Sequence, residues 1–184
     1  MITQELVSQV TLADCAVVIT RTINAPCELV FDAFTNAEHI VKWFGPDMFT
    51  AKAEIDPRVG GKISLILYGP PDGPPEMHGP FPLTGEFLEF DRPSKIVYTT
   101  DMSGHPESWK AEMAKAMGDP NANFLKGVLT ITFEPVNGKT VLTIISNFES
   151  NVVRDGFANN GMTQGWDMSL SKLEAWLTNT TANK

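Results

Sequence analysis

The sequence is poor in the residue types that build metal centres and disulfide bridges. It contains two cysteines and three histidines. His39, His78 and His105 each lack a second histidine or cysteine at the spacing of a metal motif. Cys15 and Cys27 stand on either side of an expected strand, which separates them by roughly 30 Å. We therefore expect unpaired, reduced thiols, no metal site and no cofactor.

Long apolar runs and excess positive charge are also missing. No stretch approaches the roughly 20 apolar residues that cross a bilayer, and Met1 to Asp14 has no basic segment typical of a signal peptide. Acidic residues outnumber basic ones by 22 to 14, giving a formal net charge of -8. Such a surface repels phosphate backbones and anionic lipids. We expect a soluble cytoplasmic protein that binds neither nucleic acid nor membranes.

Catalytic signatures are absent too. The sequence has no Gly-x-Ser-x-Gly elbow, no Walker loop and no dinucleotide-binding Gly-x-Gly-x-x-Gly. Its Gly60-Gly61 pair follows a turn and does not open a helix, so this pair does not indicate a nucleotide site. No residue is therefore assigned a catalytic role. With 184 residues, the chain has the length of one globular domain, and we expect residues 1–184 to form it.

What is present is a succession of short elements with clear periodicity. Alternating apolar residues predict a first strand over about Ala16 to Asn24. A helix over Pro26 to Thr35 follows, and Asn36 is placed to cap a second short helix that ends before Pro46. The next segments alternate or are rich in β-branched residues, which predicts six further strands: Phe49–Ile55, Lys62–Tyr68, Pro82–Phe90, Lys95–Asp101, Phe124–Glu134 and Lys139–Glu149.

Roughly the last 30 residues return to helical periodicity, with apolar side chains three or four positions apart from Met162 through Trp166 and Leu170. One long amphipathic helix is expected here. Turn chemistry between the strands indicates an antiparallel meander. The fold class is therefore α+β: a helix-grip in which a seven-stranded antiparallel sheet curls around the C-terminal helix, with two short helices after the first strand.

Several blocks, in this order, carry a resemblance to a known family: Arg21-Thr-Ile-Asn-Ala-Pro26, Val30-Phe31-Asp-Ala33, Trp43-Phe44-Gly45-Pro46, Asp56-Pro-Arg58-Val-Gly60-Gly61 and Gly161-Met-Thr-Gln-Gly165-Trp166. The chain resembles the activator of heat-shock chaperone ATPase homologue group of the START-like SRPBCC superfamily over about Ala16 to Thr178. The resemblance implies a Bet v-like helix-grip fold with a cavity between the long helix and the sheet. Across the superfamily that cavity holds hydrophobic molecules.

Two segments depart from the shorter family pattern. Residues 69–82 are rich in proline, which predicts a stiff loop. Residues 103–123 present Trp109, Met113 and Met117 on one face of an expected short helix. That face must be buried, either as a lid over the cavity mouth or as a contact with a second subunit in a homodimer.

Aromatic and methionine side chains are the candidate ligand-binding residues, since shape and burial hold apolar ligands. The same residue types equally suit an ordinary core. We expect a small hydrophobic molecule in a pocket of roughly 300 Å³ or more. The candidates are Trp43, Phe44, Tyr68, Phe87, Tyr98, Trp109, Met113, Met162, Trp166 and Leu170.

Two other functions stay open. A cyclase or dehydratase acting on a hydrophobic intermediate needs an inward acid or base, for which the candidates are His78, His105, Tyr98 and Glu86. An adaptor that activates a chaperone ATPase in the stress response instead needs an exposed surface for its protein partner.

Overall fold

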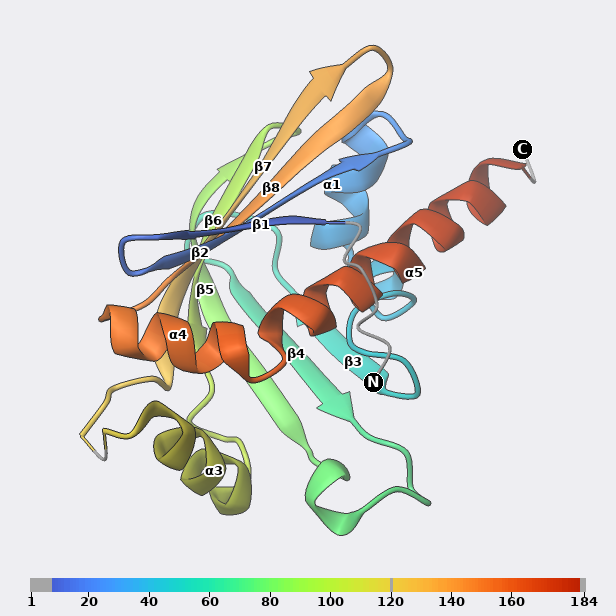
Figure 1. The fold of residues 1–184 in the computed structure, drawn as a ribbon. Helices are drawn as coiled ribbons and strands as arrows, with labels where there is room; N and C mark the ends of the chain where they lie inside the picture. Colours follow the sequence, from blue (N-terminus) through green and yellow to red (C-terminus); the bar gives the residue numbers. More distant parts are fainter. Residues whose placement is uncertain (1–7, 120, 183–184) are drawn as a thin grey trace.

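A computed structural model describes residues 8–119 and 121–182. Over these residues, eight strands form one antiparallel sheet in the order β1-β2-β8-β7-β6-β5-β4-β3 (Figure 1). The strands are β1 Gln9–Ala13, β2 Ala16–Ile23, β3 Thr50–Ile55, β4 Lys62–Tyr68, β5 Phe81–Asp91, β6 Lys95–Asp101, β7 Lys126–Val136 and β8 Lys139–Asn147. From β3 to β8, each strand pairs with the strand that follows it in the sequence, which confirms the expected meander.

The sheet has one strand more than the sequence predicted. β1 pairs with β2 from Gln9↔Thr20 to Ala13↔Ala16, and Cys15 adopts a left-handed φ of 50° in the turn between them. β1 is short, and its Leu12 is 50% exposed. Because an edge strand buries little on either face, its apolar residues give only a weak alternating signal.

The helices are α1 Cys27–Thr35, α2 Ala37–Ile40, η1 Pro75–Met77, α3 Glu107–Met117, α4 Asn151–Asn159 and α5 Met162–Ala182. The expected cap is present, since the Asn36 side chain accepts a hydrogen bond from the Glu38 amide at 2.8 Å. No helix in the described residues is long and apolar enough to cross a bilayer.

The expected long C-terminal helix is present as α5, and a separate helix that was not expected, α4, precedes it. α4 begins at Ser150, whose hydroxyl accepts from the Val153 amide, and its C-cap is Asn160. Gly161 then takes a φ of 91° and turns the chain into α5. Since glycine adopts this conformation without steric cost, Gly161 lets the chain turn sharply between two consecutive helices.

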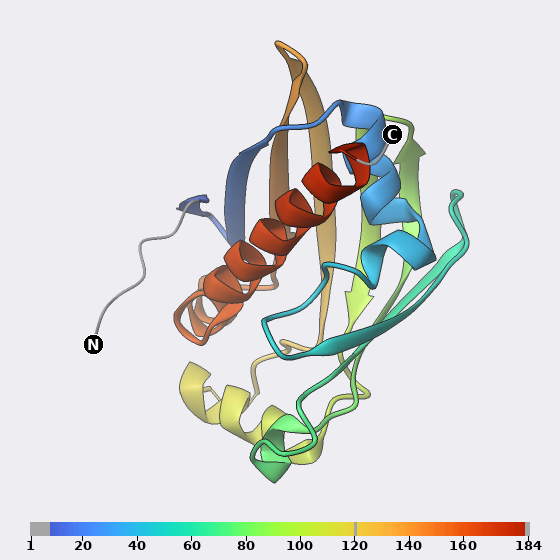
Figure 2. The same cartoon turned by 90° about the vertical axis from the view of Figure 1, so that its right-hand side faces the viewer.

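α5 runs across one face of the sheet (Figure 2). Its Leu170, Leu173 and Leu177 belong to one buried cluster together with residues of α1 and of most of the strands. A second cluster joins α3 to α4 through Met113, Met117, Phe124, Val153 and Phe157. Phe124, expected at the start of a strand, packs here instead, and β7 begins two residues later at Lys126.

A buried ion-pair network ties α5 to β2. The Arg21 guanidinium donates to Asp167 Oδ1 at 3.2 Å, to Ser171 Oγ at 3.2 Å and to the Glu174 carboxylate. The Arg21 side chain is only 5% exposed. Asp167 and Glu174 lie about two helical turns apart on the same face of α5, so one arginine fixes that face against the strand.

Candidate functional site

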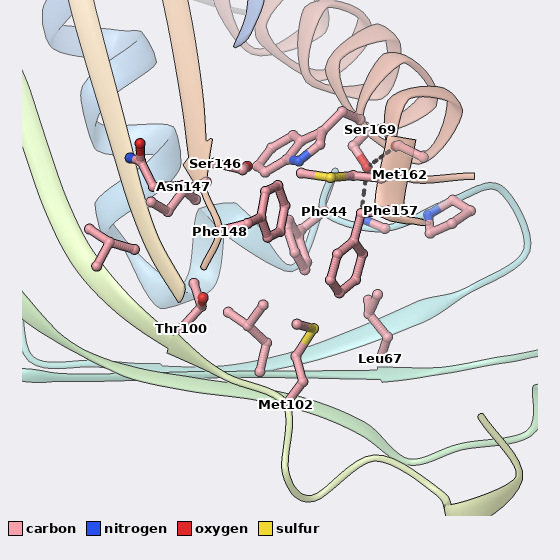
Figure 3. A pocket seen from close by; sticks show the side chains of 17 residues that line it. Phe44, Leu67, Thr100, Met102, Ser146, Asn147, Phe148, Phe157, Met162 and Ser169 are labelled. Atoms are coloured by element: carbon pink, nitrogen blue, oxygen red, sulfur yellow. Dashed lines mark hydrogen bonds between the residues drawn. The ribbon is translucent and has the colours of Figure 1, made fainter. Parts of the chain in front are cut away.

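A pocket of about 220 Å³ opens between the start of α5 and the sheet (Figure 3). Side chains from α5, α4 and the ends of several strands form its walls. The lining residues are Phe44, Gly45, Pro46, Leu67, Leu83, Thr100, Met102, Val128, Leu129, Ser146, Asn147, Phe148, Phe157, Met162, Gly165, Trp166 and Ser169.

α5 contributes one helical face to the pocket. Met162, Gly165, Trp166 and Ser169 follow one another at spacings of three, one and three, which places them on one side of the helix. A Cβ built on Gly165 would meet no heavy atom within 4 Å apart from its two chain neighbours and the nearby backbone of its own helix. The helix therefore leaves open space at the position where any other side chain would enter the pocket.

The opposite wall comes from the inward face of β8. Leu142, Ile144 and Ser146 alternate along this strand and are all buried, and Phe148 follows at the next inward position. Ser146 lies between Val17 on β2 and Leu129 on β7. The alternation therefore turns a hydroxyl, and not a hydrocarbon, toward the pocket.

The two buried serines of the pocket differ in their hydrogen bonds. Ser169 Oγ donates to the Gly165 carbonyl at 2.8 Å and accepts from the Gly45 amide at 3.1 Å, as the dashed lines in Figure 3 show. Ser146 is 5% exposed, and its Oγ has no hydrogen-bond partner among the described residues. An unsatisfied buried hydroxyl costs about 1–3 kcal/mol.

Aromatic rings limit the volume of the pocket. The Phe44 and Trp166 rings meet edge to face with centroids 6.0 Å apart. Phe148 and Phe157 stack at 5.0 Å, and the Phe44, Phe148 and Phe157 side chains crowd its centre (Figure 3). The volume is therefore below the roughly 300 Å³ that the sequence led us to expect.

Three of the ten candidate ligand-binding residues line the pocket: Phe44, Met162 and Trp166. Four others lie in the core and outside the lining: Trp43, Phe87, Tyr98 and Leu170. Trp43 illustrates the reason, because its indole N–H donates to the Ala33 carbonyl at 3.1 Å inside the α1–α2 layer. Burial raises the pKa of the Tyr98 phenol well above its ordinary value.

The remaining three candidates also lie outside the lining. Tyr68 lies beneath the Lys52 ammonium, which is 5.3 Å from its ring centroid. Trp109 and Met113 pack in the second cluster between α3 and α4. The apolar face of α3 is thus covered within its own chain, where Gly156 of α4 allows Met117 to approach closely.

The proton-transfer candidates do not converge on the pocket. The His78 ring nitrogen lies 2.8 Å from the Gly73 carbonyl oxygen, and Glu86 pairs with Lys62 in a partly exposed ion pair. His105 packs against Trp109 with ring centroids 4.2 Å apart. Desolvation, aided by Lys110 and opposed by a hydrogen bond to the Pro82 backbone, lowers the pKa of His105 to about 4.

Fourteen of the 17 lining residues were not among the candidates, including Gly165, Ser146, Met102, Phe148 and Phe157. For Ser146 on β8 and Phe148 directly after it a signal was available, since both continue the inward register of Leu142 and Ile144. Phe157 gave no such signal, because it reaches the pocket only through the break between α4 and α5. In the part of the chain that the structure describes, no group of three or more histidine, cysteine or acidic residues is placed to hold a metal ion.

A family model and several solved structures match this chain. The family model described as Activator of Hsp90 ATPase homolog 1-like protein matches residues 24–178. No curated protein matches the chain.

Solved structures with low sequence identity share the fold. Protein NE0264 from Nitrosomonas europaea is 20% identical with a TM-score of 0.72, covering 94% of this chain and 99% of its own. A Rhodobacter sphaeroides protein is 18% identical with a TM-score of 0.74, covering 94% and 98%.

A third structure, an HSP90 activator from Plasmodium falciparum, is 24% identical with a TM-score of 0.55, covering 89% of this chain and 96% of its own. The family match extends from the start of α1 almost to the end of α5. The chain therefore belongs to the Activator of Hsp90 ATPase homolog 1-like family, within the START-like SRPBCC superfamily.

Proposed function

We propose that this protein binds a small hydrophobic molecule in the pocket between α5 and the sheet, without catalysing a reaction on it. The observation that carries the proposal is the open space beside Gly165. Glycine within a helix costs about 0.5–1 kcal/mol relative to alanine. A glycine that faces an apolar pocket lowers helix stability and at the same time keeps the pocket open.

The environment of the pocket supports the same function. Its lining is predominantly hydrocarbon and aromatic, as in sites that hold apolar ligands by shape and burial. The four proton-transfer candidates lie elsewhere, so an enzymatic function has less support from the geometry than a binding function.

Filling the pocket from the helix tests the proposal. In Gly165→Leu the side chain extends into the space that is open at the Cβ position, whereas Gly165→Ala adds only one methyl group there. Ligand binding to the folded state raises the unfolding temperature. We expect a panel of small apolar compounds to raise it for the wild type and for Gly165→Ala, but not for Gly165→Leu.

A panel that stabilises none of the three proteins would rule out the function. Equal stabilisation of wild type and Gly165→Leu would place binding at another surface and would contradict the proposed site.

Activation of a chaperone ATPase is a second candidate, favoured by the family match over residues 24–178 and by the fold shared with the Plasmodium activator. The test is the ATPase rate of an Hsp90-type chaperone with saturating amounts of this protein. Stimulation that persists in Gly165→Leu would assign the activity to the surface, and no stimulation of the wild type would reject it.

A further inference from the structure

The chemistry of the pocket wall indicates which class of molecule it takes, and this inference rests on the proposed function. Among the described residues, none of the lining side chains belongs to aspartate, glutamate, lysine, arginine or histidine. Burying an ionised ligand group without a charged partner is strongly unfavourable. Ligands that would bury a carboxylate or an ammonium group in this pocket are therefore expected to bind weakly.

One buried hydroxyl in this wall is available for a ligand. Ser146 Oγ is buried and lacks a partner, while Ser169 Oγ already donates one hydrogen bond and accepts another. Of the other polar side chains in the lining, Asn147 is exposed, and Thr100 and the donor Trp166 are half-buried. Only at Ser146 is a buried hydroxyl left to be satisfied by an incoming oxygen.

The volume bounds the size of the molecule. An apolar cavity of about 150 Å³ in another protein is large enough for benzene. The 220 Å³ here therefore suits one ring with a short substituent, or an aliphatic molecule of similar bulk. A sterol or a long acyl chain is too large for the pocket in this form.

We propose that the pocket takes an uncharged, single-ring-sized apolar molecule whose one oxygen hydrogen-bonds to Ser146 Oγ. Ser146 is the specificity-determining residue, since its hydroxyl can hydrogen-bond to a carbonyl or hydroxyl oxygen at one place in a largely apolar wall. The surrounding lining discriminates against the corresponding acid.

Three matched probes test the proposal by ligand-observed NMR titration near pH 7. Acetophenone supplies a ring and a neutral carbonyl, isopropylbenzene has a similar shape without the oxygen, and benzoate carries a charge. One hydrogen bond predicts that the Ser146 hydroxyl strengthens acetophenone binding by about 3–10-fold and leaves isopropylbenzene binding nearly unchanged. Benzoate should bind more weakly than either.

The variant Ser146→Ala removes the hydroxyl and provides the control. We expect it to weaken acetophenone binding by the same 3–10-fold or so while changing isopropylbenzene less than about twofold. A purely structural role of Ser146 would instead change the affinities of both neutral probes together.

The possible outcomes distinguish a failure of this inference from a failure of the proposed function. Insensitivity of acetophenone binding to Ser146→Ala, or preferred binding of benzoate, would each overturn the ligand class and leave apolar binding intact. Stabilisation by other compounds of the panel, with none of the three probes bound, would overturn the assigned size. Failure of every compound would overturn the inference and the function together.

Discussion

Ser146 and Ser169 lie on opposite walls of one pocket with opposite hydrogen-bonding states. The Ser169 hydroxyl joins the start of α5 to Gly45, whose φ of 100° turns the chain after α2. The Ser146 hydroxyl is buried without a partner. Buried polar groups are normally satisfied, so each exception needs a specific explanation.

This contrast predicts stability changes of opposite sign for the same substitution. Ser146→Ala removes an unsatisfied hydroxyl and should raise the free energy of unfolding by about 1 kcal/mol. Ser169→Ala leaves the Gly45 amide unpaired and should lower it by about 1–2 kcal/mol. Urea unfolding of the ligand-free proteins measures both. A loss of stability in Ser146→Ala would mean that its hydroxyl is already satisfied.

His105 makes stability depend on pH in a defined window. Its folded pKa of about 4 lies below its ordinary value of 6.5, so between these values the unfolded chain binds a proton that the folded protein does not. Stability contributed by the neutral ring is therefore complete above pH 6.5 and is lost as the pH falls to about 4. After allowance for solvent screening of this half-buried ring, the loss is about 1–2 kcal/mol.

Comparison with His105→Phe isolates this contribution from the carboxylates that titrate in the same range. The variant should lose less unfolding free energy than the wild type between neutral and acidic pH. Parallel stability curves for the two proteins would contradict the depressed pKa.

At the scale of elements, α5 has a pocket face at its start and an ion-pair face in its middle. The Arg21 side chain is 5% exposed and that of Asp167 is 13% exposed, whereas the pair of Arg92 with Asp32 is 50% and 39% exposed. Buried pairs are costly to break and exposed pairs contribute little.

We therefore predict that Arg21→Met lowers the free energy of unfolding by about 3 kcal/mol, and that the matched Arg92→Met lowers it by less than about 1 kcal/mol. Denaturant unfolding provides the comparison. Similar small losses in both variants would show that packing alone holds α5 against β2.

At the scale of the whole molecule, the meander and the α1–α2 pair follow from the sequence, because alternating burial and capping residues are local signals. The extra strand β1 and the break at Gly161 did not follow. An exposed edge strand has few buried residues to mark its alternation. A helix break at one glycine leaves the spacing of apolar residues on either side nearly unchanged.

The pocket was less predictable than the fold. Phe44, Met162 and Trp166 line it, but Trp43, Phe87 and Leu170 share their residue types and lie in the core. Periodicity identifies the inward face of a helix or strand. It does not say whether the space opposite that face is filled, because this depends on how α4, α5 and the strand ends meet in three dimensions.

Binding of a neutral ring compound at Ser146 can be observed in a crystal of the wild-type protein soaked with acetophenone. We expect electron density for the ring enclosed by Phe44, Phe157 and Trp166, with the carbonyl oxygen within hydrogen-bond distance of Ser146 Oγ. A pocket closed by those three side chains, with acetophenone absent or bound only on the outer surface, would contradict it.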